Sequence, residues 1–184
     1  MLLNMRPSSA KQITEEEALK RLSDLCAQAE YCPNDIRRKM SLWQLSEELQ
    51  QRILERLEVD HFIDELRYAR AFVRDKFRYN RWGPKRLEME LRCKGIAVDL
   101  IQEALMEITP QDANETLLRL LQAKVRTTRG RNDYERAAKL VQFALRKGFL
   151  MEDARRIAGQ ILDGIETDTP ENVDGIDAWH HEDP

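Results

Sequence analysis

The sequence predicts an all-α protein built from tandem three-helix repeats. The chain has only seven glycines and six prolines in 184 residues, so it offers few breaks for turns. Charged residues make up 34% of it, against a usual ~25%. Apolar residues recur at spacings of three and four along most of the chain, the period of an amphipathic helix, and no segment shows the alternation of a strand. These patterns indicate about nine helices in three groups.

Residues 14–63 are the first expected repeat. Thr14 is followed three positions later by Glu17, a capping box that starts a helix. Pro33 begins a second helix that reaches about Met40, and a third is expected over 42–57. This repeat is acidic, because residues 14–60 carry eleven acids and seven bases.

Residues 64–110 and 111–162 are the second and third expected repeats. The helices predicted in them cover 64–79, 84–94 and 97–108, then 111–127, 133–147 and 152–162. Pro84 suits a first helical position, where its missing N–H costs nothing. Gly95 and Gly148 suit helix ends, because glycine readily adopts the left-handed conformation there.

The clearest internal match joins these two repeats. Lys94-Gly95-Ile96 corresponds to Lys147-Gly148-Phe149 at an offset of 53 residues, a spacing typical of stacked helical units. The expected counterpart in the first repeat is Lys39-Met40-Ser41, which lacks the glycine. Terminal repeats are often atypical.

Both chain ends are expected to lie outside the repeats. Residues 1–13 are expected to be a flexible N-terminus, and residues 163–184, with eight acids and no Lys or Arg, a disordered acidic tail. The tail serves either as a solubilising segment or as an intramolecular cover for basic segments. No run approaches the ~18 apolar residues of a membrane span, and the start lacks the apolar stretch of a secretory signal. We therefore expect a cytoplasmic protein with no membrane contact and with reduced cysteines.

Basic residues concentrate in two blocks. Residues 65–96 carry ten bases and four acids, and residues 119–148 carry nine bases and two acids. On the helix expected over 64–79 and just beyond it, five arginines fall within an arc of roughly 80° at 100° per residue: Arg67, Arg70, Arg74, Arg78 and Arg81. Like charges at these spacings repel. This arginine face therefore predicts a partner-binding ridge, with a merely solvated face as the alternative.

Two further groups are candidate contact residues. Trp82, Lys85 and Arg86 surround a helix start, where the tryptophan either packs between repeats or contacts a partner. The second basic block contributes Lys124, Arg126, Arg129 and Arg131 around an expected loop. Such a segment binds either nucleic-acid phosphates or an acidic protein surface.

Catalytic motifs are absent from the sequence. There is no phosphate-binding glycine loop, nucleophile elbow or HExxH motif. His61 is the sole histidine outside the tail and is expected at a helix boundary. We therefore expect a binding protein that is not an enzyme and has no cofactor and no metal site.

One family resemblance rests on the second repeat. The motif residues are Asp64-Glu65-Leu66-Arg67-Tyr68-Ala69-Arg70-Ala71-Phe72-Val73, then Trp82-Gly83-Pro84-Lys85-Arg86-Leu87 and Lys94-Gly95-Ile96. Together they resemble the signature of the RecX family of regulatory proteins, which modulate the bacterial recombinase RecA. The resemblance implies an elongated, curved array that lies in the groove of the RecA filament on single-stranded DNA. It further implies restricted filament growth or stability, with lower ATP hydrolysis, strand exchange and SOS co-protease activity.

Two other functions remain open at this point. One is sequence-independent nucleic-acid binding by a helical protein, with single-stranded or duplex DNA held on the basic faces. The other is a helical-repeat scaffold for an unrelated partner. In each case we expect a monomer.

Overall fold

The computed structural model describes residues 13–167, and within that range helices joined by short turns and loops are the only regular secondary structure. This confirms the all-α prediction. Nine helices cover the described residues: α1 (Glu15–Cys26), α2 (Pro33–Leu42), α3 (Glu47–Val59), α4 (Glu65–Asn80), α5 (Pro84–Cys93), α6 (Val98–Leu105), α7 (Pro110–Val125), α8 (Asp133–Lys147) and α9 (Met151–Thr167).

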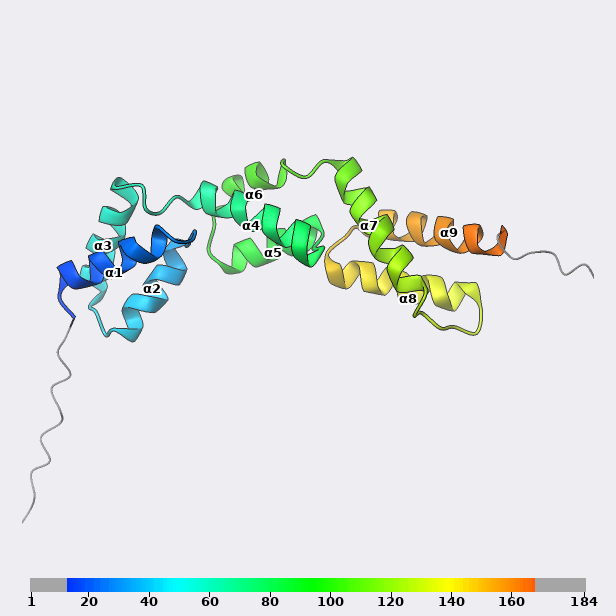
Figure 1. The fold of residues 1–184 in the computed structure, drawn as a ribbon, viewed down its shortest axis with the longest axis horizontal. Coiled ribbons are helices and arrows are strands. Elements are labelled where there is room, and N and C mark those ends of the chain that lie inside the picture. Colours follow the sequence, from blue (N-terminus) through cyan, green and yellow to red (C-terminus); the bar gives the residue numbers. More distant parts are fainter. Residues whose placement is uncertain (1–12, 168–184) are drawn as a thin grey trace, which may run out of the picture.

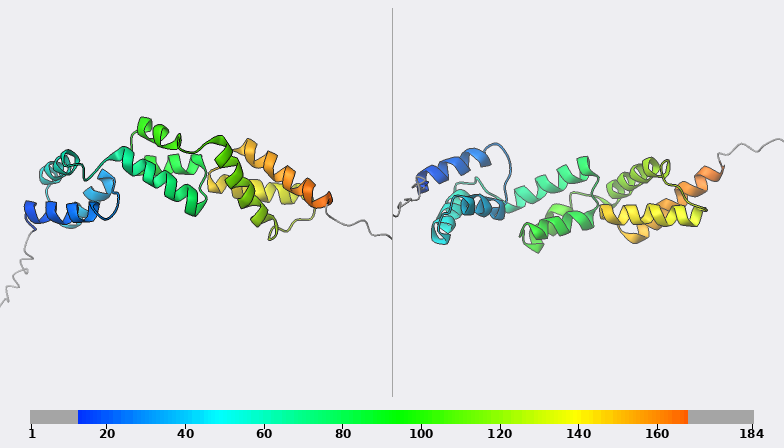
Figure 2. Two further views of the ribbon diagram at one scale, coloured as in Figure 1. Left: turned by 45° about the horizontal axis from the view of Figure 1, so that its top comes forward. Right: turned by 90° about the horizontal axis from the view of Figure 1, so that it is seen from below.

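The helices form three groups of three, arranged as an arched row (Figures 1 and 2). Each group encloses its own core. Leu22, Ile36 and Ile53 are among the buried residues of the first, Leu87 and Leu91 of the second. The third core includes the fully buried Leu117, Leu121 and Leu140. The tandem three-helix architecture is therefore confirmed.

Two helix boundaries differ from the sequence prediction by five residues. The third helix begins at Glu47 and not at Leu42, because the Ser46 side chain accepts a hydrogen bond from the Leu49 amide and caps it there. The ninth helix runs to Thr167, five residues beyond the expected limit of 162. Residues 1–12 and 168–184 lie outside the described residues, so the expectations for those segments stay predictions.

All three second helices end in the same left-handed turn. The turn residues are Gln44, Gly95 and Gly148, with φ of 59°, 82° and 92°. In each case the next residue donates its amide to the carbonyl five positions earlier, at 3.1–3.3 Å. The first-repeat counterpart of Lys94-Gly95-Ile96 is therefore Trp43-Gln44-Leu45. The predicted match to Lys39-Met40-Ser41 is wrong by four residues.

The second and third repeats meet where the start of α5 approaches the end of α8. The Gly83 amide donates to the Lys147 carbonyl at 2.7 Å, and the Lys85 amide donates to the Gly148 carbonyl at 3.0 Å. The first amides and last carbonyls of a helix have no partner within it. At this junction the amides at the start of α5 bond to the carbonyls at the end of α8, and the two helix dipoles align head to tail.

The first and second repeats meet in the same way, but through side chains. At the start of α2, the Asn34 side-chain amide donates to the Lys94 carbonyl at 2.8 Å. The Lys94 ammonium lies 2.8 Å from both carboxylate oxygens of Asp35. Cys32 belongs to the core of the second repeat. As a result α2, α5 and α8 follow one another along the lower edge of the molecule in Figure 1.

Glycine at the junctions is explained by how closely the repeats approach. A Cβ on Gly148 would overlap the backbone nitrogen and Cβ of Arg86, and one on Gly83 would overlap the Gly148 carbonyl. A Cβ on Gly95 would overlap the Asn34 side-chain amide. Gln44, at the outer end of the row, is exposed. A side chain is therefore accommodated at this position despite the positive φ.

Gly148→Ala should lower the free energy of unfolding by about 2–4 kcal/mol, through left-handed strain and overlap with Arg86. Urea unfolding followed by circular dichroism measures this. Gly159→Ala is the matched control, because no atom lies within 4 Å of the added Cβ. A helix-interior alanine there should raise stability by up to about 1 kcal/mol. Equal effects of the two changes would contradict the account of the junction.

The ion pair at the first junction predicts a pH dependence. Burial alone would raise the pKa of Asp35, but hydrogen bonds from Lys94 and Cys32 and the charges of Lys94 and Arg38 outweigh it and lower that pKa from 3.8. A lowered carboxyl pKa stabilises the fold above the unfolded-state value, and this stabilisation is lost as the pH falls through the folded-state value.

Asp35→Asn should therefore cost about 1–2 kcal/mol of unfolding free energy near pH 7, through the lost charged hydrogen bonds. The difference from the unmodified chain should shrink once the pH drops below 3.8, as urea titrations at several pH values would show. A constant difference down to pH 2 would contradict the pairing.

Candidate interaction surface

The arginine face of α4 divides into two halves. In the first half, Arg67 Nε lies 2.7 Å from a Glu30 carboxylate oxygen, and the Arg67 guanidinium also donates to the carbonyls of His61 and Phe62. Glu30 belongs to the first repeat, so Arg67 ties the first repeat to the second.

Arg70 is held inside the second repeat. Its guanidinium lies 2.7 Å from Glu103 and 3.5 Å from Glu107, which joins α4 to α6. The carboxylate partners of these two arginines are distant in the chain, because Glu30 is 37 positions from Arg67 and Glu103 is 33 positions from Arg70. Partner binding by Arg67 and Arg70 stays a prediction, and both have a role within the fold.

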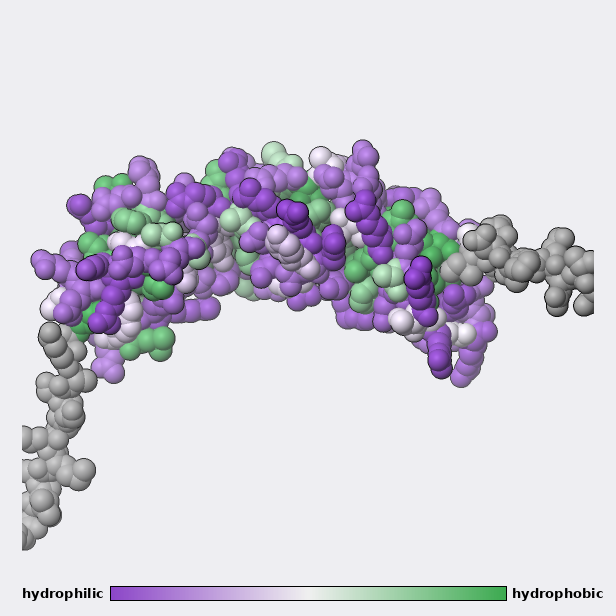
Figure 3. Space-filling model, viewed as in Figure 1, coloured by the Kyte–Doolittle hydropathy of each residue, from purple (hydrophilic) through white to green (hydrophobic). Residues whose placement is uncertain are grey.

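The second half of the face is unpaired. Arg74, Arg78 and Arg81 are exposed, and none has a carboxylate within 4.0 Å among residues 13–164. The Arg78 guanidinium lies 5.6 Å from the centre of the Tyr79 ring. Arg81 ends α4 in the left-handed conformation, with φ of 55°. Hydrophilic residues cover this part of the molecule in Figure 3.

Trp82 lies between the unpaired arginines and the junction at Gly83. Its half-buried ring packs on the second core, with the Phe72 ring centre 6.2 Å away. The Arg86 guanidinium stacks 4.1 Å from the ring centre, and the Lys76 ammonium lies at 5.8 Å. Cations over an aromatic face are attracted by its quadrupole. Trp82 therefore has a packing role, and part of its ring remains accessible.

Lys85 and Arg86 differ in what they contact. Arg86 lies 3.6 Å from Glu90 and donates to the Arg146 carbonyl at 3.4 Å, so it reaches across the second junction. Lys85 lies 3.7 Å from Glu88 with two thirds of its side chain exposed. An exposed pair of that length contributes little to stability, and partner binding by Lys85 stays a prediction.

The segment between α7 and α8 forms a second basic group. Arg126, Arg129 and Arg131 are exposed and have no carboxylate within 4.0 Å in the part of the chain that the structure describes. Lys124 is half-buried, with its ammonium 5.3 Å from the Phe143 ring centre.

Glu135 and Asn132 hold this segment in place. The Asn132 side chain accepts from the Glu135 amide at 2.9 Å and caps α8. The Arg131 amide donates to the Glu135 carboxylate at 2.9 Å. That hydrogen bond and the neighbouring Lys139 lower the pKa of Glu135. The backbone of Arg131 is therefore held in place while its side chain is exposed.

The described residues offer no group of three or more His, Cys, Asp or Glu side chains that could hold a metal ion. His61 lies just after α3 with φ of 58°, which confirms the expected helix boundary. None of the helices in residues 13–167 is both long and apolar enough to cross a membrane.

Family models match both basic repeats. The model for the second three-helix domain of RecX matches residues 64–105, and that for the third matches 111–157. The regulatory protein RecX of Prosthecochloris aestuarii is 30% identical over 146 residues, which cover 79% of this chain and 94% of that protein. The chain belongs to the RecX family. A regulatory role comes with that membership.

Other RecX proteins are longer than this chain or less similar to it in sequence. The chain covers only about half of the RecX protein of Lactobacillus johnsonii, to which it is 30% identical. A crystal structure of a regulatory protein RecX superposes with a TM-score of 0.71 at 28% identity, over 81% of this chain and 71% of that one. RecX from Lactobacillus salivarius, at 19% identity and a TM-score of 0.69, supports the fold.

The division of the arginine face predicts different costs for two similar changes. Arg70→Gln should lower stability by about 0.5–1 kcal/mol, because Glu103 and Glu107 lose their shared cation. Arg74→Gln, one helical turn further on, should leave stability unchanged. Thermal unfolding of the two variants distinguishes them, and equal midpoints would show that the Arg70 pairs contribute nothing.

Proposed function

We propose that this RecX protein is a non-enzymatic negative regulator of the RecA recombinase. It binds in the groove of the RecA filament on single-stranded DNA and limits filament growth or stability. Lower ATP hydrolysis, strand exchange and SOS co-protease activity follow from that. Family membership supports the regulatory part of this proposal.

The observation that carries the proposal is the unpaired half of the α4 face. Arg67 and Arg70 have carboxylate partners, whereas Arg74, Arg78 and Arg81 have none within 4.0 Å among residues 13–164. Arginine is suited to bidentate contact with carboxylates and phosphates. An acidic surface of RecA or the backbone of its bound DNA would supply those groups.

The shape of the molecule suits a polymeric partner. An arched row of repeats exposes much surface for its length, and each repeat can contact a different protomer (Figure 1). Several weak contacts made at once give high overall affinity when the spacing fits. Electrostatic contacts of this kind weaken as salt rises.

A second candidate function rests on the segment between α7 and α8. The exposed Arg126, Arg129 and Arg131 there favour direct, sequence-independent binding of nucleic-acid phosphates. Such binding needs no recombinase, so titration of labelled single-stranded DNA with the protein alone tests it.

Arg74→Glu/Arg78→Glu should reduce inhibition of RecA by tenfold or more, because both charges would then repel the partner. Dose–response curves of ATP hydrolysis by RecA on single-stranded DNA measure this. Lys20→Glu/Arg21→Glu is the matched control, since it makes the same charge change at exposed positions of α1. It should shift the curve by less than twofold.

Two outcomes would count against the proposal. The first is equal loss of inhibition in both double variants, which would indicate a general effect of net charge. The second is tight, salt-sensitive binding to naked DNA without any effect on recombinase ATP hydrolysis, which would favour the nucleic-acid function.

A further inference from the structure

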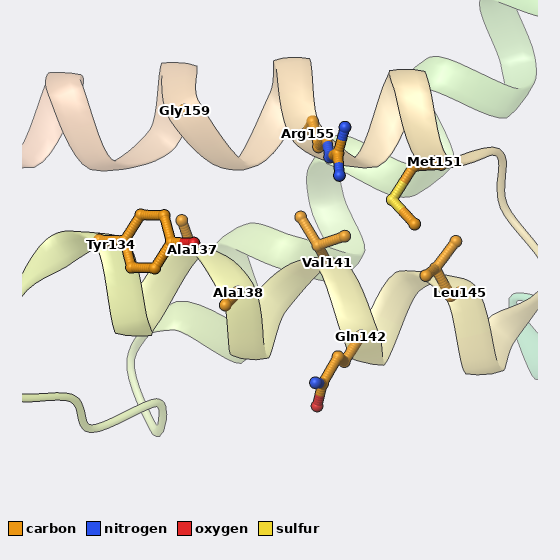
Figure 4. Close-up of a pocket in the computed structure, with 9 residues that line it drawn as sticks. All are labelled: Tyr134, Ala137, Ala138, Val141, Gln142, Leu145, Met151, Arg155 and Gly159. Atoms are coloured by element: carbon orange, nitrogen blue, oxygen red, sulfur yellow. The ribbon is translucent and has the colours of Figure 1, made fainter.

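An apolar groove runs between α8 and α9, the two antiparallel helices at the end of the third repeat (Figure 4). Its volume is about 450 Å³. Nine residues line it: Tyr134, Ala137, Ala138, Val141, Gln142, Leu145, Met151, Arg155 and Gly159. Hydrophobic residues also gather at this end of the molecule in Figure 3.

The lining is unusually exposed for its apolar character. Tyr134 is 86% exposed, Met151 43% and Leu145 36%. Gly159 leaves the wall open, because no atom lies within 4 Å of where its Cβ would be. Contiguous exposed apolar surface of this kind commonly marks a binding site.

One cation points into this groove. Arg155 projects from α9 toward α8 in Figure 4 and has no carboxylate within 4.0 Å in the described residues. Arg126, Arg129 and Arg131 lie just before the start of α8, at the end of the groove marked by Tyr134. An occupant that fits this surface combines apolar side chains with several acids.

The chain itself leaves α9 beside this surface. Because α9 is antiparallel to α8, its end at Thr167 lies near the start of α8 (Figures 1 and 4). Seventeen residues follow, 168–184, which reach about 55–60 Å when extended. The fifteen residues of α8 span only about 22 Å. Every part of the groove is therefore within reach.

The composition of that segment matches the surface. Residues 168–184 carry six acids and no Lys or Arg, and they include Ile176 and Trp179. We propose that residues 168–184 of the same chain occupy the α8–α9 groove, with Ile176 and Trp179 against its apolar wall and the acids facing Arg155 and the basic segment before α8.

This docking makes the segment a competitor for the partner. The acids would meet Arg126, Arg129 and Arg131, which are the groups that a phosphate backbone or an acidic protein would also contact. A partner that binds there must displace the segment, so its apparent affinity falls by the fraction of molecules in which the segment is docked. This consequence rests on the proposed function, whereas the docking itself does not.

The docking is tested on the full chain without any partner. Three tryptophans give three indole N–H signals in a proton–nitrogen NMR spectrum, and Trp179→Phe identifies the one from Trp179. In the unmodified chain this signal should lie away from the position of an indole in an unfolded peptide. Tyr134→Ser, which removes an exposed groove residue, should move it toward that position.

Leu42→Ser is the matched control, because Leu42 is 82% exposed but ends α2 in the first repeat. It should leave the Trp179 signal in place. A Trp179 signal at the unfolded position in the unmodified chain overturns the proposal. So does a displaced signal that returns to the unfolded position on dilution, because the occupant would then be a second copy.

A separate measurement addresses the competition. Asp168→Asn/Glu171→Gln/Asp174→Asn/Asp177→Asn should raise affinity for a single-stranded oligonucleotide at low salt severalfold, measured by fluorescence anisotropy. Adding Arg126→Gln/Arg129→Gln/Arg131→Gln to that variant should abolish the gain. Unchanged affinity in the first variant, with the Trp179 signal still displaced, would reject the competition and leave the docking intact.

Discussion

The structure depends on the pairing of one helix start with the next repeat's helix end. A helix leaves its first amides and last carbonyls without partners within the helix. Here the amides at the start of α5 donate to the carbonyls at the end of α8. Neither Cys32 nor Gly83, the residues that precede α2 and α5, makes a side-chain cap. Asn132, which precedes α8 at the outer end of the row, does cap its helix. Capping by the neighbouring repeat therefore sets how the repeats are joined.

Within the basic motif, some arginines hold the array together and others have no such role in the described residues. Arg67, Arg70 and Arg86 are each bound to a carboxylate or carbonyl that holds two elements together. Arg74, Arg78 and Arg81 make no such contact in the described part of the chain. A motif that is basic throughout thus contributes to the fold in one half, and the proposed function uses the other half, which is unpaired in the described residues.

Sequence patterns predicted the helices and their grouping well, because periodicity, capping boxes and Pro–Gly positions are local signals. Sequence patterns failed where a residue's role depends on a contact with a residue far away in the chain. The partners of Arg67 and Arg70 come from other helices, and the kinship of Gln44 with Gly95 and Gly148 is visible only in the backbone. The role of glycine at Gly83 depends on contact with Gly148, 65 positions away, which no local pattern reports.

The two junctions between repeats are built from different chemical groups, and they therefore differ in their response to salt. Backbone hydrogen bonds cross between the second and third repeats. Between the first and second, the contacts come from side chains: the Asn34 amide, the Lys94–Asp35 and Arg67–Glu30 ion pairs, and the buried Cys32. Peptide hydrogen bonds respond little to ionic conditions, while a partly exposed ion pair is screened by salt. Salt therefore weakens the contacts of the first junction more than those of the second.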